Sequence, residues 1–207
     1  MASVLDLLNT SAGKELINKI QNKTSENSSG ITSVLGMALP ALLGAVHKNI
    51  QEPQGAEKLN NALEDQQHGE GFLKNLSNIP SDEIAEKGNK ILQHILGDRK
   101  EQVTKTISGM SQVKESSVAD IIKMAAPVVM SLLASQKRKD NVGTSGLQGL
   151  VQSVLGASGK HDHSLIETML DKNKDGSVID DVSGMILGGN KKNNGKGGIL
   201  GGMLGGK

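Results

Sequence analysis

Two long apolar segments, each with a proline in its middle, constrain the fold of this chain more than any other feature. They span residues 31–50, with Pro40, and 117–134, with Pro127. In the first segment the small or polar residues fall at positions 33, 36 and 44, a narrow stripe on an otherwise apolar helix. A helix of this kind is buried on most sides, so we predict that each segment is a central core helix.

The two prolines predict a bend in each of these helices. Pro40 removes one helix hydrogen bond, and its ring presses against the carbonyl group of residue 36. The bend could act as a hinge or as a fixed structural feature, and we favour the fixed bend.

The two prolines also align the halves of the chain as an internal repeat with an offset of 87 residues (127 − 40). Apolar residues coincide at this offset, and so do small or polar ones. Examples are Leu5 with Leu92, Leu16 with Val103, Ile20 with Ile107, Leu35 with Ile122, Met37 with Met124, Gly36 with Lys123 and Gly44 with Ser131. Helix periodicity alone does not explain the shared proline, so we predict a duplication.

Helical periodicity dominates the chain and no segment alternates like a strand, so the predicted fold class is all-α. We expect two tandem, structurally similar multi-helix units with kinked central helices, over residues 1–80 and 81–160. We expect residues 161–187 to form an EF-hand-like loop with short flanking helices, and residues 188–207 to form a Gly-rich flexible tail with two apolar islands. Because each long helix is apolar on nearly every side, we expect the two copies to bury these helices against each other or against another subunit.

Several residues are predicted to mark helix ends. Ser11 is a candidate N-cap for a helix with Leu16 and Ile20 on one face. Asp98 and Glu101 have the spacing of a capping box, and Ser116 or Ser117 is expected to begin the second apolar helix. Cations at 137–139 suit its C-terminal end.

Much of the chain resembles a bacterial domain-of-unknown-function family typified by YidB. The resemblance is carried by residues 95–103 (ILGDRKEQV), by Gly109-Met110-Ser111 and by residues 118–129 (VADIIKMAAPVV). The Asp-rich loop and the Gly-rich end are similar as well. The resemblance implies an all-α fold with a homeodomain-like arrangement of helices, and it implies no activity.

Composition excludes several classes of function. Lys and Arg total 23 against 22 Asp and Glu, so the chain lacks the cationic excess that nucleic-acid binding draws on. Phe72 is the only Phe, Tyr or Trp residue, which disfavours base or sugar stacking. The absence of cysteine removes disulfides, thiolate zinc sites and thiol nucleophiles.

The N-terminus and the apolar segments predict a cytoplasmic protein. Residues 1–10 lack a basic region and carry Asp6, unlike a secretory signal. The uncharged stretches 31–46 and 124–135 are shorter than the ~20 residues that a membrane span needs. We therefore expect no transmembrane span.

The sharpest motif is the acidic loop that begins at Asp171. Oxygen ligands stand at loop positions one, three and five, Gly176 at six and a carbonyl at seven, as at the start of an EF-hand. Position twelve is Val182 where a bidentate Glu is usual, so weak Ca²⁺ binding is expected. Alternatively, Asp180 caps a following helix and the loop is an Asx-type turn. The candidate ligands are Asp171, Asn173, Asp175, Ser177, Asp180 and Asp181.

Other candidate sites are weaker. His161 and His163 have chelating spacing, but two ligands on a polar loop favour a solvated loop. His47, His68 and His94 stand alone on predicted helices. No nucleophile–base–orienter set and no Gly-x-Ser-x-Gly elbow is visible in the sequence, and we expect no enzyme and no small-molecule substrate.

The sequence thus favours a non-enzymatic structural or protein-interaction protein that self-associates. A Ca²⁺-binding module using the 171–182 loop is the alternative. A helix-turn-helix nucleic-acid binder, formed by residues 98–110 and 117–134, is a lesser one, because its second helix is too apolar to face a DNA groove.

Overall fold

The computed structural model describes residues 5–65 and 69–156, and this part of the chain is mostly helical, with no β-strand. The predicted all-α class is therefore confirmed there. The α-helices are α1 (Ser11–Thr24), α2 (Ser28–Asn49), α3 (Pro53–Glu64), α4 (Glu70–Lys74), α5 (Ser81–Ile95), α6 (Lys100–Ser111), α7 (Glu115–Lys139) and α8 (Leu147–Gly156). Short 3-10 turns are η1 (Asp6–Asn9), η3 (Leu76–Asn78), η4 (Gly97–Arg99) and η5 (Thr144–Gly146).

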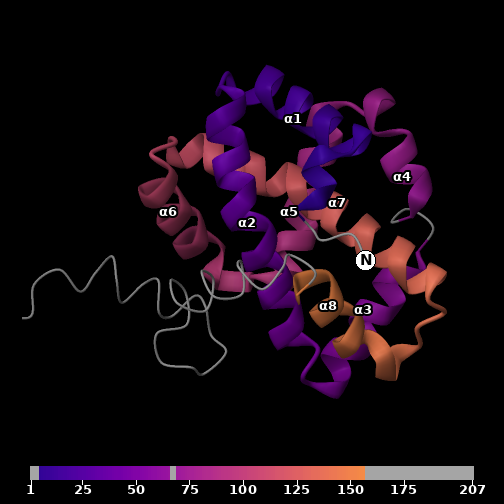
Figure 1. The fold of residues 1–207 in the computed structure, drawn as a ribbon. Helices are drawn as coiled ribbons and strands as arrows, with labels where there is room; N and C mark the ends of the chain where they lie inside the picture. The colour runs from indigo at the N-terminus through magenta and orange to yellow at the C-terminus, as the bar shows by residue number, and fades with distance from the viewer. Residues whose placement is uncertain (1–4, 66–68, 157–207) are drawn as a thin grey trace, which may run out of the picture.

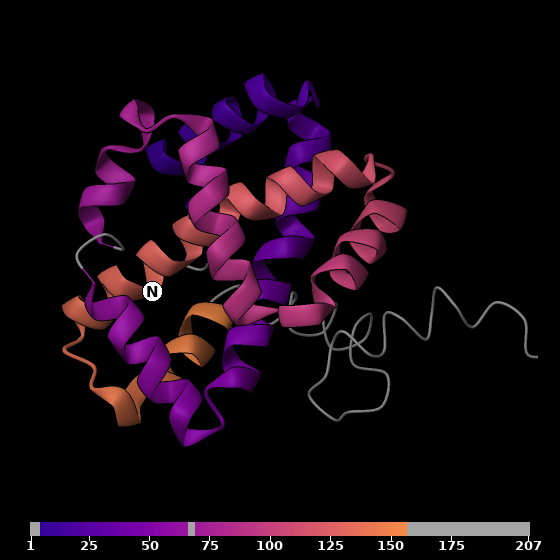
Figure 2. The same ribbon diagram turned by 180° about the vertical axis from the view of Figure 1, so that it is seen from behind.

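Helix α7 is the centre of the described fold. It contacts each of the other described α-helices, most extensively α5. Figure 1 shows α7 running through the middle of the molecule, and the reverse view in Figure 2 shows α5 lying across it. This position follows from its sequence, because a helix that is apolar on most sides has to be surrounded by others.

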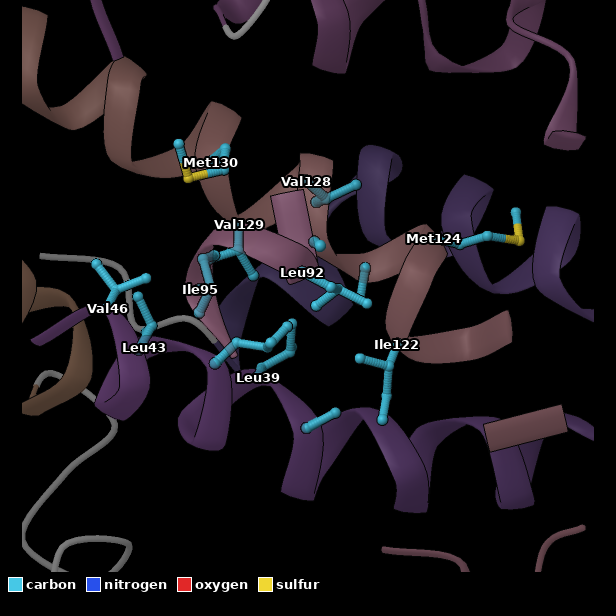
Figure 3. Close-up of a cluster of buried hydrophobic side chains, with 14 of the residues drawn as sticks. Leu39, Leu43, Val46, Leu92, Ile95, Ile122, Met124, Val128, Val129 and Met130 are labelled. Atoms are coloured by element: carbon cyan, nitrogen blue, oxygen red, sulfur yellow. The ribbon is translucent and has the colours of Figure 1, made fainter. Parts of the chain in front are cut away.

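The core joins residues from both halves of the chain. Leu39 of α2, Leu92 of α5 and Ile122 of α7 are each at most 1% exposed and belong to one continuous apolar cluster. Figure 3 shows side chains from these three helices meeting. The cluster consists of Leu, Ile, Val, Met and Ala residues together with Phe72. The long helices of the two halves contact each other, α2 against α7, as their apolar surfaces predict.

Both internal prolines lie inside uninterrupted helices. Pro40 is within α2 and Pro127 is within α7, and both residues are buried. Each proline lacks the N–H that would bond to the carbonyl four residues earlier, which is Gly36 in α2 and Lys123 in α7. The predicted bends stay predictions.

Several helix ends differ from the predicted ones. The N-cap of α1 is Thr10, whose Oγ1 accepts from the amide of Gly13 at 3.1 Å, so Ser11 is the first helical residue instead. The Asp98–Glu101 capping box is wrong, because Asp98 lies in the turn η4 and α6 has no side-chain cap. Helix α7 begins at Glu115, before the predicted serines. Gly97, with a φ of 54°, takes the left-handed conformation expected of glycine at a helix end.

Local geometry repeats at the offset of 87 residues. Helices α2 and α7 begin at Ser28 and Glu115. The residues that end α1 and α6, Ser25 and Gln112, are both left-handed, with φ of 59° and 58°. The amide of Ser25 donates to Gln21 O at 2.9 Å, and that of Gln112 to Ser108 O at 3.0 Å. Non-glycine residues seldom adopt this conformation, so its occurrence at both positions is a specific similarity.

Polar contacts tie the ends of distant helices together. Asn49 at the end of α2 donates from Nδ2 to Ile95 O of α5 at 2.9 Å. Lys137 Nζ in the last turn of α7 pairs with Glu64 Oε1 of α3 at 3.2 Å. The contact from Asn49 satisfies a carbonyl at the end of α5, where backbone carbonyls lack partners within the helix.

The predicted units fall only partly within the described residues. The predicted boundary between residues 80 and 81 coincides with the short link between η3 and α5, and it stays a prediction. The predicted segments 161–187 and 188–207 lie outside the described residues.

Candidate functional site

The predicted metal ligands lie outside the part of the chain that the structure describes. This holds for Asp171, Asn173, Asp175, Ser177, Asp180 and Asp181, and for His161 and His163. Among residues 5–65 and 69–156, no group of three or more His, Cys, Asp or Glu residues is placed to hold a metal ion. The Ca²⁺ site therefore stays a prediction from the motif.

Helices α6 and α7, joined by a short turn, occupy the predicted helix-turn-helix segment. The position of a recognition helix would be taken by α7, whose most apolar 18-residue window is 78% buried within the fold. A recognition helix has to expose its side chains to the groove of the nucleic acid. Most of α7 is instead covered by the other helices.

Two of the described helices, α2 and α7, are long and apolar enough to cross a membrane by length and composition. In the fold, 56% of the apolar window of α2 and 78% of that of α7 are buried against the rest of the protein. Both helices are longer than the uncharged stretches 31–46 and 124–135 on which the sequence prediction was based. For this reason they reach the length of a membrane span although those stretches do not. Core helices of globular proteins have the same properties.

The described residues form a shallow groove between α5, α6 and α7. Its volume is about 400 Å³, and it is open to solvent on one side. Leu92 of α5 and Ile122 of α7 form an apolar floor, each 1% exposed. The rest of the lining comes from the N-terminal parts of α6 and α7 and consists mostly of polar residue types: Lys100, Glu101, Thr104, Glu115, Ser116, Ala119 and Lys123.

The charges around this groove are only partly paired. Lys123 Nζ bonds to Asp120 Oδ1 at 2.9 Å, and Lys100 Nζ donates to Asn89 Oδ1 at 3.1 Å. Glu101 and Glu115 are exposed and have no ion pair or hydrogen bond from their carboxylates to any described residue. With Asp120 counted, three carboxylates face two lysines, so the groove carries a net charge of −1.

The groove offers groups that can bind a partner. Thr104 Oγ1 donates to the Lys100 carbonyl at 2.9 Å within α6, so this hydroxyl is already satisfied. The groove has an apolar floor, the unpaired carboxylates of Glu101 and Glu115, and Lys100, whose hydrogen-bond partner Asn89 is neutral. An apolar centre with a polar rim is typical of protein recognition surfaces. The sequence did not predict the groove. Its residue Glu101 was predicted to form a capping box with Asp98 instead.

A second surface of interest is the outward face of α2. Met37, Gly44 and His47 are half-buried there, whereas Met124, Ser131 and Ala134, which stand 87 residues later in α7, are 0% exposed. Neighbouring helices therefore cover this face in α7 and leave it partly open in α2. A Cβ atom placed on Gly36 or on Gly44 would meet nothing within 4 Å, so the face has space for a partner.

Comparison with known proteins gives one family. The family model described as bacterial protein of unknown function (DUF937) matches the chain over residues 6–136 and 137–207. No curated protein and no solved structure matches the chain.

Proposed function

Because this chain belongs to DUF937, a bacterial family of unknown function, we propose a function from its own residues: it is a non-enzymatic interaction protein that self-associates through the open face of α2. The observation that carries this proposal is the difference between α2 and α7. Met37, Gly44 and His47 remain partly exposed at positions whose counterparts in α7 are fully buried.

The occupant that best fits this face is a second copy of the chain. The open face of α2, formed by Met37, Gly44 and His47 with Gly36 beside them, carries no Asp or Glu. Small residues such as Gly36 and Gly44 allow two helices to approach closely. In a two-fold dimer the same surface is used on both partners, which such a self-complementary stripe permits.

Sedimentation velocity over a range of concentrations tests this proposal. We expect the full-length protein to sediment faster as its concentration rises, and the Gly44→Arg variant to stay monomeric. Gly149→Arg is the matched control, since Gly149 of α8 is also helical with nothing within 4 Å of an added Cβ. A wild-type protein that is monomeric at every concentration, or a Gly44→Arg variant that associates like wild type, would refute the proposal.

The tandem arrangement belongs to the same proposal. The left-handed residues Ser25 and Gln112 and the matching starts of α2 and α7 support an origin of α1–α2 and α6–α7 from one duplicated unit. The proposal also includes four expectations that rest on the sequence alone. These are the specific resemblance to YidB, the kinks in the central helices, the flexible tail and a cytoplasmic location.

Ca²⁺ binding is a second candidate function, favoured by the oxygen ligands at residues 171, 173, 175 and 177. Titration calorimetry of the full-length protein with CaCl₂ tests it, with Asp171→Ala and Asp175→Ala as loop variants and Asp162→Ala as a control outside the loop. We expect heat from wild type and the control and none from the loop variants. No heat from wild type at millimolar Ca²⁺ would eliminate this function.

Nucleic-acid binding is the weakest of the three functions. Residues 5–156 have balanced charge, and α7 is largely buried. A gel-shift assay at low salt, where phosphate contacts are strongest, is expected to show no complex with duplex DNA. A complex whose affinity falls steeply with added salt would reverse this ranking.

A further inference from the structure

The open face of α2 carries a long side chain and, two turns further on, a space for one. Met37 is half-buried and packs against the core with only part of its surface. Gly44 is half-buried as well, and a Cβ atom added to it would meet nothing within 4 Å. Because seven residues make almost two turns of an α-helix, Met37 and Gly44 lie on the same side of α2, roughly 10 Å apart.

The direction in which two copies of α2 meet decides whether these two features fit together. In a two-fold dimer the two helices are either parallel or antiparallel. In a parallel pair Met37 would meet Met37 and Gly44 would meet Gly44, so the space at Gly44 would stay empty. In an antiparallel pair Met37 of each copy fills the space at Gly44 of the other, and the two-fold symmetry makes this contact twice. Side chains that fill spaces on the facing helix are the basis of close helix packing.

The charges of α2 favour the same direction. Its last turn carries the basic residues His47 and Lys48. A parallel pair would place Lys48 of one copy beside Lys48 of the other, and like charges facing each other across an interface are unfavourable. In the antiparallel pair Lys48, four residues after Gly44, stands opposite Ser33, four residues before Met37, and Ser33 is uncharged.

We propose that two copies of the chain pair through antiparallel α2 helices, with Met37 of each copy packed into the space at Gly44 of the other and Ser33 opposite Lys48. This inference rests on the proposed self-association through α2 and specifies its geometry. Pro40, which lies between the two contacts, is buried within its own copy, so the contacts fall on either side of it. Met37 and Gly44 thereby fix the direction of the partner.

Cross-linking between single cysteines tests the direction of the pairing. The chain has no cysteine, and Ser33 and Lys48 are exposed residues at the two ends of the face. Ser33→Cys is mixed with Lys48→Cys that carries a tag of distinct mass, and a short bismaleimide is added. We expect the mixture to give the mixed dimer and each variant alone to give little dimer, because like positions lie ~22 Å apart along antiparallel helices.

The matched control is Ser33→Cys mixed with Gln152→Cys, an exposed residue of α8, which should give no mixed dimer. Cross-linking of Ser33→Cys with itself and of Lys48→Cys with itself, without the mixed product, would show a parallel pair and overturn the proposal.

A compensating pair of substitutions tests the contact itself. Gly44→Leu should weaken self-association about tenfold or more, because the new side chain occupies the space of the partner's Met37. Adding Met37→Ala to Gly44→Leu should recover most of this loss, because it vacates that space. Adding Met110→Ala instead, at an exposed methionine of α6, should recover nothing. Sedimentation velocity measures the association of each variant, and circular dichroism shows that each keeps its helices. A Gly44→Leu, Met37→Ala variant that associates as weakly as Gly44→Leu alone would overturn the proposal.

The outcomes separate this geometry from self-association itself. A wild-type protein that stays monomeric would refute both. Association in which like positions cross-link would keep α2 as the interface and refute only the antiparallel pairing. Association without any cross-link at positions 33 and 48 would show that the copies meet through another surface, and it too would refute both.

Discussion

The backbone of Gly88 in α5 lies directly against the carbonyl group of Lys123 in α7. A Cβ atom at position 88 would overlap with the Lys123 carbonyl oxygen and would stand 2.6 Å from the carbonyl carbon. This carbonyl is also the one that would accept from residue 127, and Pro127 has no N–H to donate. Because of Pro127, the Lys123 carbonyl lacks its usual hydrogen bond within α7. The backbone of α5 contacts α7 at this same carbonyl, with no side chain between them.

Replacing Gly88 by alanine is expected to destabilise the protein. The new methyl group meets backbone atoms, which cannot move aside like the end of a side chain, and such overpacking costs about 1–3 kcal/mol. Gly36→Ala is the matched control, because Gly36 occupies the position of Lys123 in the first half and an added Cβ meets nothing within 4 Å. Alanine should stabilise that helix by about 0.5–1 kcal/mol. Urea unfolding measures both, and a Gly88→Ala variant as stable as wild type would contradict the packing.

Replacing Ser131 by alanine is expected to stabilise the protein. Ser131 is 0% exposed, and its Oγ has no hydrogen-bond partner. Removing a buried hydroxyl without a partner should raise the free energy of unfolding by about 1 kcal/mol. Ser153→Ala is the comparison, since Ser153 Oγ donates to Leu150 O at 2.8 Å and its loss should bring no gain. Loss of stability in Ser131→Ala would show that the hydroxyl has a partner in solution.

The ion pair between Lys23 and Asp82 is expected to make stability depend on pH. Nζ of Lys23 lies 2.5 Å from Asp82 Oδ1, and this hydrogen bond lowers the pKa of the Asp82 carboxyl and raises the pKa of Lys23. A carboxyl with a lowered pKa stabilises the fold above its unfolded pKa, and this contribution is lost as the pH falls through the folded value.

Asp82→Asn should therefore melt at a slightly lower temperature than wild type at neutral pH and at the same temperature in strong acid. The effect is small because Asp82 is 91% exposed. Thermal unfolding from pH 2 to pH 7 measures it, with Asp98→Asn as a control carboxylate in the turn η4. A gap between Asp82→Asn and wild type that widens as the pH falls would contradict the prediction.

The continuous core predicts that both halves unfold together. Leu39 of α2 is 0% exposed and shares its cluster with residues of α5 and α7. Leu39→Ala should cost about 2–5 kcal/mol and shift a single transition, as seen by circular dichroism and by calorimetry. A second transition that Leu39→Ala leaves unchanged would indicate independent units. A fragment of residues 1–80 that folded by itself would show the same.

Much of the fold could be predicted from the sequence, because helix periodicity and apolar segments are local signals. The two central helices and their burial agree with the prediction. The N-cap of α1 at Thr10, the start of α7 at Glu115 and the missing capping box at Glu101 differ from it. Several residue types can cap a helix. Which of several adjacent residues becomes the N-cap depends on how the preceding turn packs, and before α1 this turn is η1, which contacts α1.

The candidate groove could not have been predicted in the same way. Leu92, Glu101 and Glu115 come from three helices, and no motif in the sequence relates them. The predicted metal ligands are the opposite case, because they form a motif within one short segment, residues 171–181. This segment lies outside the described residues, so the structure does not test the predicted site.

By itself, the sequence determined that residues 5–65 and 69–156 are mostly helical and that the segments around Pro40 and Pro127 are buried helices, whereas the repeat of the two halves stays a prediction. These properties depend on periodicity and composition, which are fixed along the chain. Only the tertiary structure decided that α7 rather than α2 lies at the centre, that Gly88 meets the Lys123 carbonyl, and that one face of α2 stays open. The two helices have similar sequences but different neighbours, and burial depends on the neighbours.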